Sequence, residues 1–171
     1  MPRTIYHTQL NSPWGPVLLA GTGKAICACE FVDGKNVSNL LARVQKQNCD
    51  SLVREDLTPL AAAVDGLNRY FLGEPEVLDH PLDLLGTQFQ NEVWSALRKI
   101  PLGGVATYGD IAAQIGRPGG ARAVGQACGA NPALLFVPCH RVVAAGGKLG
   151  GFAGGLALKE ALLRHEGINV R

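Results

Sequence analysis

A cysteine, a histidine and an arginine follow one another at positions 139–141, directly after Pro138 and the apolar run "ALLFV" (133–137). The thiolate is the nucleophilic form of cysteine, and a free thiol with a pKa of about 8.5 is only slightly ionised at neutral pH. A neighbouring base or positive charge increases the ionised fraction. Because adjacent side chains of an extended chain point apart, we expect His140 to act on Cys139 through a bridging water unless the chain turns here. The pattern predicts a cysteine nucleophile with a histidine base.

A histidine used as a base needs a partner on its second ring nitrogen, which fixes the tautomer. Glu166 is the best candidate, because "LALKEALLRHEG" (156–167) has the spacing of a helix that ends at Gly167. A carboxylate in the last turn of a helix is disfavoured by the macrodipole. This position favours a role in the site, although a chance surface position explains it as well.

The elements that must position Cys139 begin with the run 133–137, which is typical of a strand buried on both faces. Asn131-Pro132 turns the chain into this strand, and Pro138 ends its regular pairing, so that Cys139 faces a pocket. The glycine-rich stretch 144–156 follows and lacks the spacing of a nucleotide-phosphate loop.

Three helices are predicted upstream of that strand, over residues 88–100, 108–116 and 121–130. Thr87 and Gln90 have the spacing of a capping box, and Thr107 begins the second helix with Asp110 at its third position. The third helix consists almost wholly of small residues, which let a backbone approach a partner closely. Two helices joined by a short glycine turn indicate a helix-turn-helix motif; a packed helical corner without a DNA partner is the alternative.

The first half of the chain is predicted to contain strands and then helices. Strands are expected over 3–10, 15–21 and 24–31, and helices over 36–47 and 58–73. Thr58 is the expected N-cap of the second helix, with Pro59 at its first position. An extended connection follows over 74–86, which divides the chain into domains 1–85 and 86–171.

Composition and charge indicate the class of protein. The hydrophobic content of 47% and charged content of 18% are typical of a globular chain, and its N-terminus lacks the apolar centre of a signal peptide. We therefore expect a cytoplasmic protein, associated with the nucleoid if the source is bacterial. Residues 87–171 carry 9 basic and 4 acidic side chains, against 7 and 10 in residues 1–86, so the second half favours a polyanion partner. The five cysteines show no CxxC spacing, and we expect free thiols and no metal site.

Five segments of the second half together resemble the O6-alkylguanine-DNA alkyltransferases, also called methylated-DNA–protein-cysteine methyltransferases. They are "TYGDIA", "GARAVGQACGANP", "VPCHRVV", "GGFAGG" and "LKEALLRHEG", and the stretch "SPWGPVLLAGTGKAICACEF" resembles the family's opening strands. The resemblance implies a ribonuclease-H-like α/β N-terminal domain and a mainly α C-terminal domain with a winged helix-turn-helix-type DNA-binding motif.

The resemblance also implies catalytic roles. Cys139 would be the alkyl acceptor, and His140, through water, and Glu166 would form the relay that holds it as thiolate. Asn131 would brace the turn that shapes the site. Tyr108 would donate a hydrogen bond to the guanine ring, so that the base leaves as a neutral molecule. The thioether product implies one turnover per protein molecule, and no cofactor is expected.

The implied partner is double-stranded DNA that carries O6-alkylguanine, with O4-alkylthymine left open. Arg122 would enter the base stack and fill the gap left by the flipped nucleotide. Binding would be sequence-neutral and in the minor groove. The protein is expected to be a monomer, with cooperative binding left open. The further residues expected to contact DNA or the base are Tyr108, Val142, Phe152, Ala153, Ala121, Ala123 and Gly125.

Some points of the sequence leave alternatives open. Phe152 stands where many relatives have tyrosine, which affects substrate preference, and the zinc ligands of some relatives are not all present. Lys159 and Arg141 fit either phosphate contacts or structural pairs. A turnover cysteine hydrolase would use the same Cys139–His140 pair, and a non-catalytic DNA-binding module would use the helix-turn-helix alone.

Overall fold

The computed structural model describes residues 3–74 and 78–170, and these form two compact units. One unit contains the described residues of 1–85 together with 132–136. The other contains the described residues of 86–131 and 137–171. Residues 75–77, which belong to the predicted connection 74–86, lie outside the described residues.

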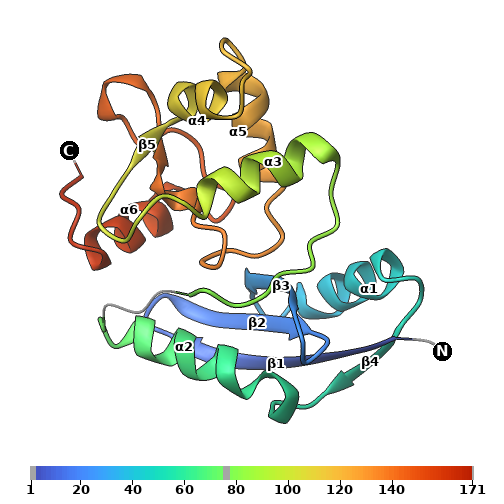
Figure 1. Ribbon diagram of the computed structural model, residues 1–171. Coiled ribbons are helices and arrows are strands. Elements are labelled where there is room, and N and C mark those ends of the chain that lie inside the picture. Colours follow the sequence, from blue (N-terminus) through green and yellow to red (C-terminus); the bar gives the residue numbers. More distant parts are fainter. Residues whose placement is uncertain (1–2, 75–77, 171) are drawn as a thin grey trace. The chain divides into compact units, whose positions relative to one another are not determined.

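The first unit is built on a four-stranded sheet in the order β3-β2-β1-β4 (Figure 1). The strands are β1 (Thr4–Ser12), β2 (Gly15–Gly21), β3 (Ile26–Phe31) and β4 (Leu52–Glu55). β2 pairs antiparallel with β1 and β3, and β4 runs parallel to β1. β2 lies inside the sheet because its run Val17–Ala20 is apolar throughout, and all four residues are fully buried.

Two helices pack within this unit. In α1 (Val37–Gln47), Leu40 and Val44 join a core cluster with Ile5 and Leu18 of the sheet. A short 3-10 turn, η1 (Thr58–Leu60), precedes α2 (Ala61–Phe71). The predicted N-cap at Thr58 is wrong, since this residue lies inside the 3-10 turn. Its backbone N–H donates to Asp56 instead.

The segment 133–137 is buried as expected but is not a continuous strand. Leu135 has a φ of 74°, a left-handed conformation that interrupts an extended chain. An isolated parallel bridge joins Ala133 to Cys29. The backbone N–H of Cys29 donates to Pro132 at 2.9 Å, and that of Leu134 donates to Cys29 at 2.8 Å. The prediction of a strand is therefore wrong, although that of burial is confirmed.

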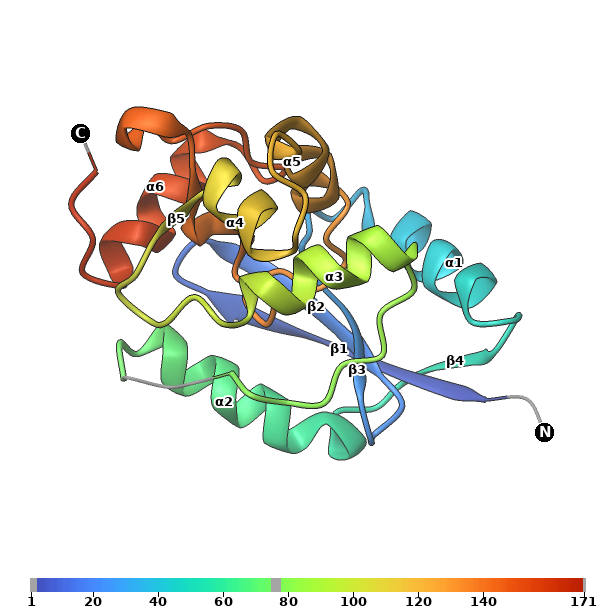
Figure 2. The same ribbon diagram turned by 45° about the horizontal axis from the view of Figure 1, so that its top comes forward.

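Three helices cluster in the second unit: α3 (Gln88–Leu97), α4 (Tyr108–Gln114) and α5 (Ala121–Gly129), as Figure 2 shows. Both predicted N-termini are confirmed, because Thr87 with Gln90 and Thr107 with Asp110 form complete capping boxes. The indole N–H of Trp94 in α3 donates to the carbonyl of Ala127 in α5 at 2.9 Å. This buried bond fixes the helix that carries Arg122.

Short elements complete the second unit. β5 (Ala106–Thr107) pairs in parallel with β6 (Val142–Val143), and α6 (Leu156–His165) follows the glycine-rich stretch. The 3-10 turns η2 (Cys139–Arg141) and η3 (Ala145–Gly147) flank β6. None of the helices in residues 3–74 and 78–170 is long and apolar enough to cross a membrane.

Candidate functional site

Cys139 lies in a turn of 3-10 helix and not at the end of a strand. Its backbone N–H donates to the carbonyl of Val137 at 2.8 Å. Asn131, which follows α5, donates from Nδ2 to the same carbonyl at 2.8 Å and to the Cys139 sulfur at 3.2 Å. The Asn131 amide thus links the two ends of the segment 131–139 and supplies a donor that suits a thiolate acceptor.

The surroundings of Cys139 have opposing effects on its pKa. Burial raises the pKa of the thiol to about 11, because a charge is costly to remove from water. The hydrogen bond from Asn131 and the positive charge of Lys159 act in the opposite direction. Formation of the thiolate at neutral pH therefore requires a base and favourable partners.

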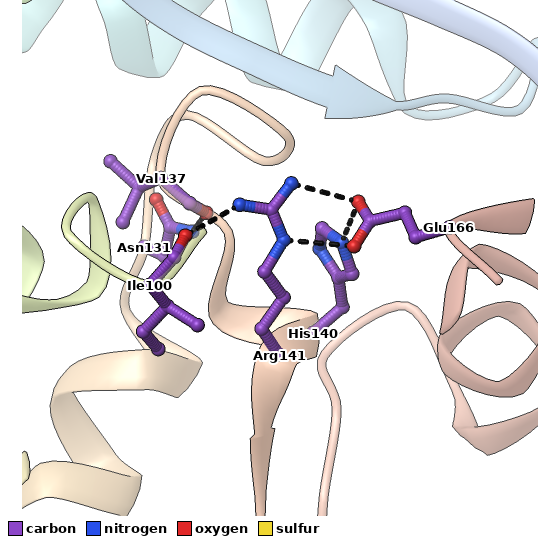
Figure 3. Close-up of polar contacts among 6 residues, drawn as sticks. All are labelled: Ile100, Asn131, Val137, His140, Arg141 and Glu166. Atoms are coloured by element: carbon purple, nitrogen blue, oxygen red, sulfur yellow. Dashed lines mark hydrogen bonds and ion pairs between the residues drawn. The ribbon is translucent and has the colours of Figure 1, made fainter. Parts of the chain in front are cut away.

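His140 and Arg141 both reach the carboxylate of Glu166, which is the C-cap residue of α6 (Figure 3). Nε2 of His140 lies 2.7 Å from Oε1 of Glu166. Arg141 donates from Nε to Oε2 at 2.8 Å and from Nη2 to Oε1 at 3.0 Å. Two consecutive side chains can share one partner because the 3-10 turn rotates them out of the alternation of a strand. The predicted pairing of His140 with Glu166 is therefore present in the structure.

The protonation states of this cluster follow from its contacts. Burial raises the pKa of Glu166, but the hydrogen bonds and charges of His140 and Arg141 outweigh it and lower the pKa to about 2. Burial is also the largest effect on His140 and lowers its pKa, with Arg141 and Lys159 acting in the same direction against Glu166. At neutral pH the site holds a carboxylate and a neutral imidazole. Such an imidazole can accept a proton.

Cys139 lines a pocket of about 500 Å³ in the second unit. Its lining residues are Tyr108, Ala121, Arg122, Gly125, Cys128, Gly129, Cys139, Gly151, Phe152 and Ala153. The hydroxyl of Tyr108 donates to the carbonyl of Gly151 at 3.2 Å. Burial raises the pKa of Tyr108, and negative charge on Cys128 or Cys139 would raise it further, so the phenol stays protonated as a donor.

Lys159 is fully buried beside this pocket. Its Nζ donates to the carbonyls of Val142 at 2.5 Å and Gly151 at 3.1 Å, and it lies 5.8 Å from the centre of the Tyr108 ring. The structure thereby decides between the two alternatives left open for this lysine. Lys159 and Arg141 make internal contacts that tie together the segments around Cys139.

Most of the predicted contact residues lie in the pocket wall, but Ala123 and Val142 are not among the lining residues. Ala123 is exposed on α5, and Val142 lies in β6 with its carbonyl bound to Lys159. Sequence reasoning missed Cys128, Gly129 and Gly151, which also line the pocket. Cys128 could have been found from helical spacing, since it lies three residues after Gly125 on the same face.

The described residues contain no group of three or more histidine, cysteine, aspartate or glutamate side chains placed to hold a metal ion. All five cysteines are free thiols.

Two family models match this chain. The model described as "6-O-methylguanine DNA methyltransferase, DNA binding domain" matches residues 88–168. The model described as "6-O-methylguanine DNA methyltransferase, ribonuclease-like domain" matches residues 5–84.

Individual relatives match over nearly the whole chain. A protein of Mycobacterium tuberculosis (strain ATCC 25618 / H37Rv), named methylated-DNA--protein-cysteine methyltransferase, is 46% identical over 166 residues, with 95% of this chain and 92% of the relative covered. A protein of the same name from Methanosarcina acetivorans is 43% identical over 163 residues, with 95% and 99% covered. The crystal structure of Mycobacterium tuberculosis OGT in complex with DNA matches with a TM-score of 0.80 and 42% identity, covering 95% of this chain and 92% of that one.

Proposed function

Because the chain belongs to the 6-O-methylguanine DNA methyltransferase family, it repairs alkylated DNA directly by transfer of the alkyl group to a cysteine, and we propose that this cysteine is Cys139. One observation carries the assignment. Cys139 is the pocket-lining thiol that accepts a hydrogen bond from Asn131 and is followed by a histidine bound to a carboxylate. Cys128 shares the pocket but lies on α5, away from that turn in the chain.

The transfer is a displacement at carbon. The sulfur of the Cys139 thiolate attacks the alkyl carbon, the bond from that carbon to O6 of guanine breaks, and its electron pair stays on the oxygen. Tyr108 donates a hydrogen bond to the ring of the departing base, which takes up one proton from water and leaves as neutral guanine, while the His140 imidazolium returns the thiol proton to water. The product is a thioether, which no side chain in residues 3–74 and 78–170 is suited to cleave, so each molecule acts once.

Deprotonation of Cys139 is assigned to His140. Its neutral imidazole takes the thiol proton through a water molecule, and the resulting imidazolium is stabilised by Glu166. The Asn131 amide and the Lys159 ammonium stabilise the negative sulfur. The base and these two partners together offset the free-energy cost of forming a thiolate at a buried position.

DNA is the partner of the second unit, and its α5 is the element we assign to the duplex. Arg122 is exposed on α5 at the rim of the pocket, a position that suits entry into the base stack when the damaged nucleotide is extruded. The small residues of α5 allow close approach to the minor groove. We assign sequence-neutral binding, since alkylation damage has no fixed sequence context. We also assign binding by a monomer.

The test is intact-protein mass spectrometry after mixing with excess duplex that contains one O6-methylguanine. The expected result is a single methyl group on all active protein, mapped to the peptide with Cys139 and absent from Cys139→Ala. Cys128→Ala is the matched control and should still be methylated. Binding without modification would indicate a damage-recognition module, and product release beyond one equivalent would indicate a turnover hydrolase.

A further inference from the structure

Arg141 makes three hydrogen bonds, of which two are to the carboxylate of Glu166. Two of them occupy both carboxylate oxygens, and the third runs from Nη1 to the carbonyl of Ile100 at 2.8 Å (Figure 3). We propose that Arg141 is a positioning residue for the alkyl transfer. It orients Glu166 and keeps it ionised, so that Glu166 accepts a hydrogen bond from His140 and does not donate one. This inference rests on the function proposed above and extends it.

The geometry determines which nitrogen of His140 carries the proton. An ionised carboxylate has no hydrogen to donate, so the 2.7 Å contact requires Nε2 of His140 to be the donor. Nδ1 of the neutral ring is then an acceptor and can receive the thiol proton. A protonated Glu166 could instead donate to Nε2, which would place the ring hydrogen on Nδ1 and remove the base.

Arg141 also affects the charge of His140. Glu166, Arg141 and Lys159 are charged or titratable groups that act on His140, and His140 and Arg141 act on Glu166. Arg141 lowers the pKa of His140 and Glu166 raises it, so removal of Arg141 would favour the imidazolium. A ring that is already an imidazolium cannot take the proton of Cys139, so the rate would fall on the acid side, where His140 is protonated while Cys139 is still a thiol.

A guanidinium suits this task better than an ammonium would. Its planar fork matches both carboxylate oxygens, while a lysine offers a single point of contact. The bond to Ile100, three residues after the end of α3, fixes the plane of the fork. The Arg141 side chain is only 12% exposed and the Glu166 side chain is fully buried, so water competes little for these bonds.

The experiment compares the rate of Cys139 methylation between pH 6 and pH 9 in single-turnover reactions with the full chain. The variants are Arg141→Met, Arg141→Lys and the double variant Arg141→Met/Glu166→Gln. Arg164→Met is the matched control, because Arg164 is exposed and pairs with Glu160 on the surface of α6. The ¹⁵N signals of the His140 ring report its tautomer and charge directly.

For Arg141→Met we expect a loss that depends on pH, with the rate relative to wild type about tenfold lower at pH 6 than at pH 9. The His140 signals should change from the Nε2–H tautomer toward imidazolium at neutral pH. The pH-dependent loss of rate in Arg141→Lys should lie between that of wild type and that of Arg141→Met. The double variant removes both charges and should return the midpoint of its profile toward wild type, even if its absolute rate is low.

Two results would overturn the inference. A loss of the same factor at every pH, with unchanged His140 signals, would mean that Arg141 only stabilises the fold. If Arg141→Met does not fold, an Arg141→Lys profile parallel to wild type with the same tautomer would overturn it equally. Failure of the proposed function would be distinguishable, because wild-type protein itself would then acquire no methyl group on Cys139.

Discussion

Gly150 determines where the ring of Tyr108 can lie. Its φ is +69°, and a Cβ at this position would lie 2.9 Å from Cε2 and 3.0 Å from the hydroxyl oxygen of Tyr108. Carbon atoms in good contact lie about 3.5 Å apart or more, so the ring would have to move by about 0.5 Å in Gly150→Ala. The hydroxyl that we assign to the leaving base would move with it.

The size of the effect follows from two separable costs. The left-handed backbone costs alanine about 1 kcal/mol, which lowers stability but not the rate. A misplacement of about 1 Å in a reacting site can cost about 100-fold, so a shift of half that size should slow the methyl transfer by about tenfold. Gly147→Ala has the same backbone cost, with φ +78° and nothing within 4 Å of the added carbon.

The assay is the single-turnover rate on O6-methylguanine duplex, with the melting temperature measured alongside. Gly147→Ala should lose stability and keep the wild-type rate. Gly150→Ala should lose both. Equal rates for Gly150→Ala and Gly147→Ala would refute the argument that Gly150 positions Tyr108.

Three further predictions concern buried charge and helix capping. Lys159→Met removes a charge that lowers the pKa of Cys139, so alkylation of Cys139 by iodoacetamide at neutral pH should slow several-fold; an unchanged rate contradicts this. The pKa of Glu166 falls from an ordinary 4.5 to about 2 on folding, so it contributes on the order of 3 kcal/mol above pH 4.5 that is lost as the pH falls toward 2. Urea unfolding at pH 3 and pH 6 should show a smaller difference for Glu166→Gln than for wild type. Thr107→Ala removes the cap of α4 and should cost about 1 kcal/mol in thermal unfolding, whereas a melting temperature equal to wild type would exclude the capping role.

Local signals predicted the helical unit well. The capping boxes at Thr87 and Thr107 depend on residues three positions apart, and both are confirmed. The family and the fold class, a ribonuclease-like domain followed by a helical DNA-binding domain, are confirmed as well. These features were accessible because the residues that specify them are close together in the chain or occur in a fixed order of motifs.

The elements that the sequence predicted wrongly, or did not predict, depend on tertiary context. The run 133–137 is apolar because it is buried, and burial alone does not distinguish a strand from a turn such as the one at Leu135. β4 (Leu52–Glu55) has four residues, of which two are charged, and it is a strand because β1 lies beside it. Neither outcome has a signal within the segment itself.

The site divides in the same way. The chemistry that we propose for Cys139 and His140 could be predicted because the two residues are adjacent, and the resemblance implied the roles that we propose for Tyr108 and Arg122. The buried position of Lys159 could not be predicted from the sequence. Its acceptors are the backbone carbonyls of Val142 and of Gly151, and Gly151 lies in the glycine-rich stretch 144–156, whose conformation the sequence does not specify. A lysine in a helix is normally a surface residue, so only the fold shows that this one is internal.

Glu166 shows how a violated local preference and its compensation fit together. A carboxylate at the C-terminal end of α6 faces the negative end of the helix dipole and is also fully buried, and both conditions oppose its charge. The sequence shows this conflict but not its resolution, which is the two-point contact with Arg141, 25 positions earlier in the chain. A carboxylate on a helix surface would have avoided both costs, and it could not have held the imidazole of a buried histidine. The conflict at Glu166 is therefore a consequence of placing a base beside a buried thiol, and Arg141 is the residue that makes that placement stable.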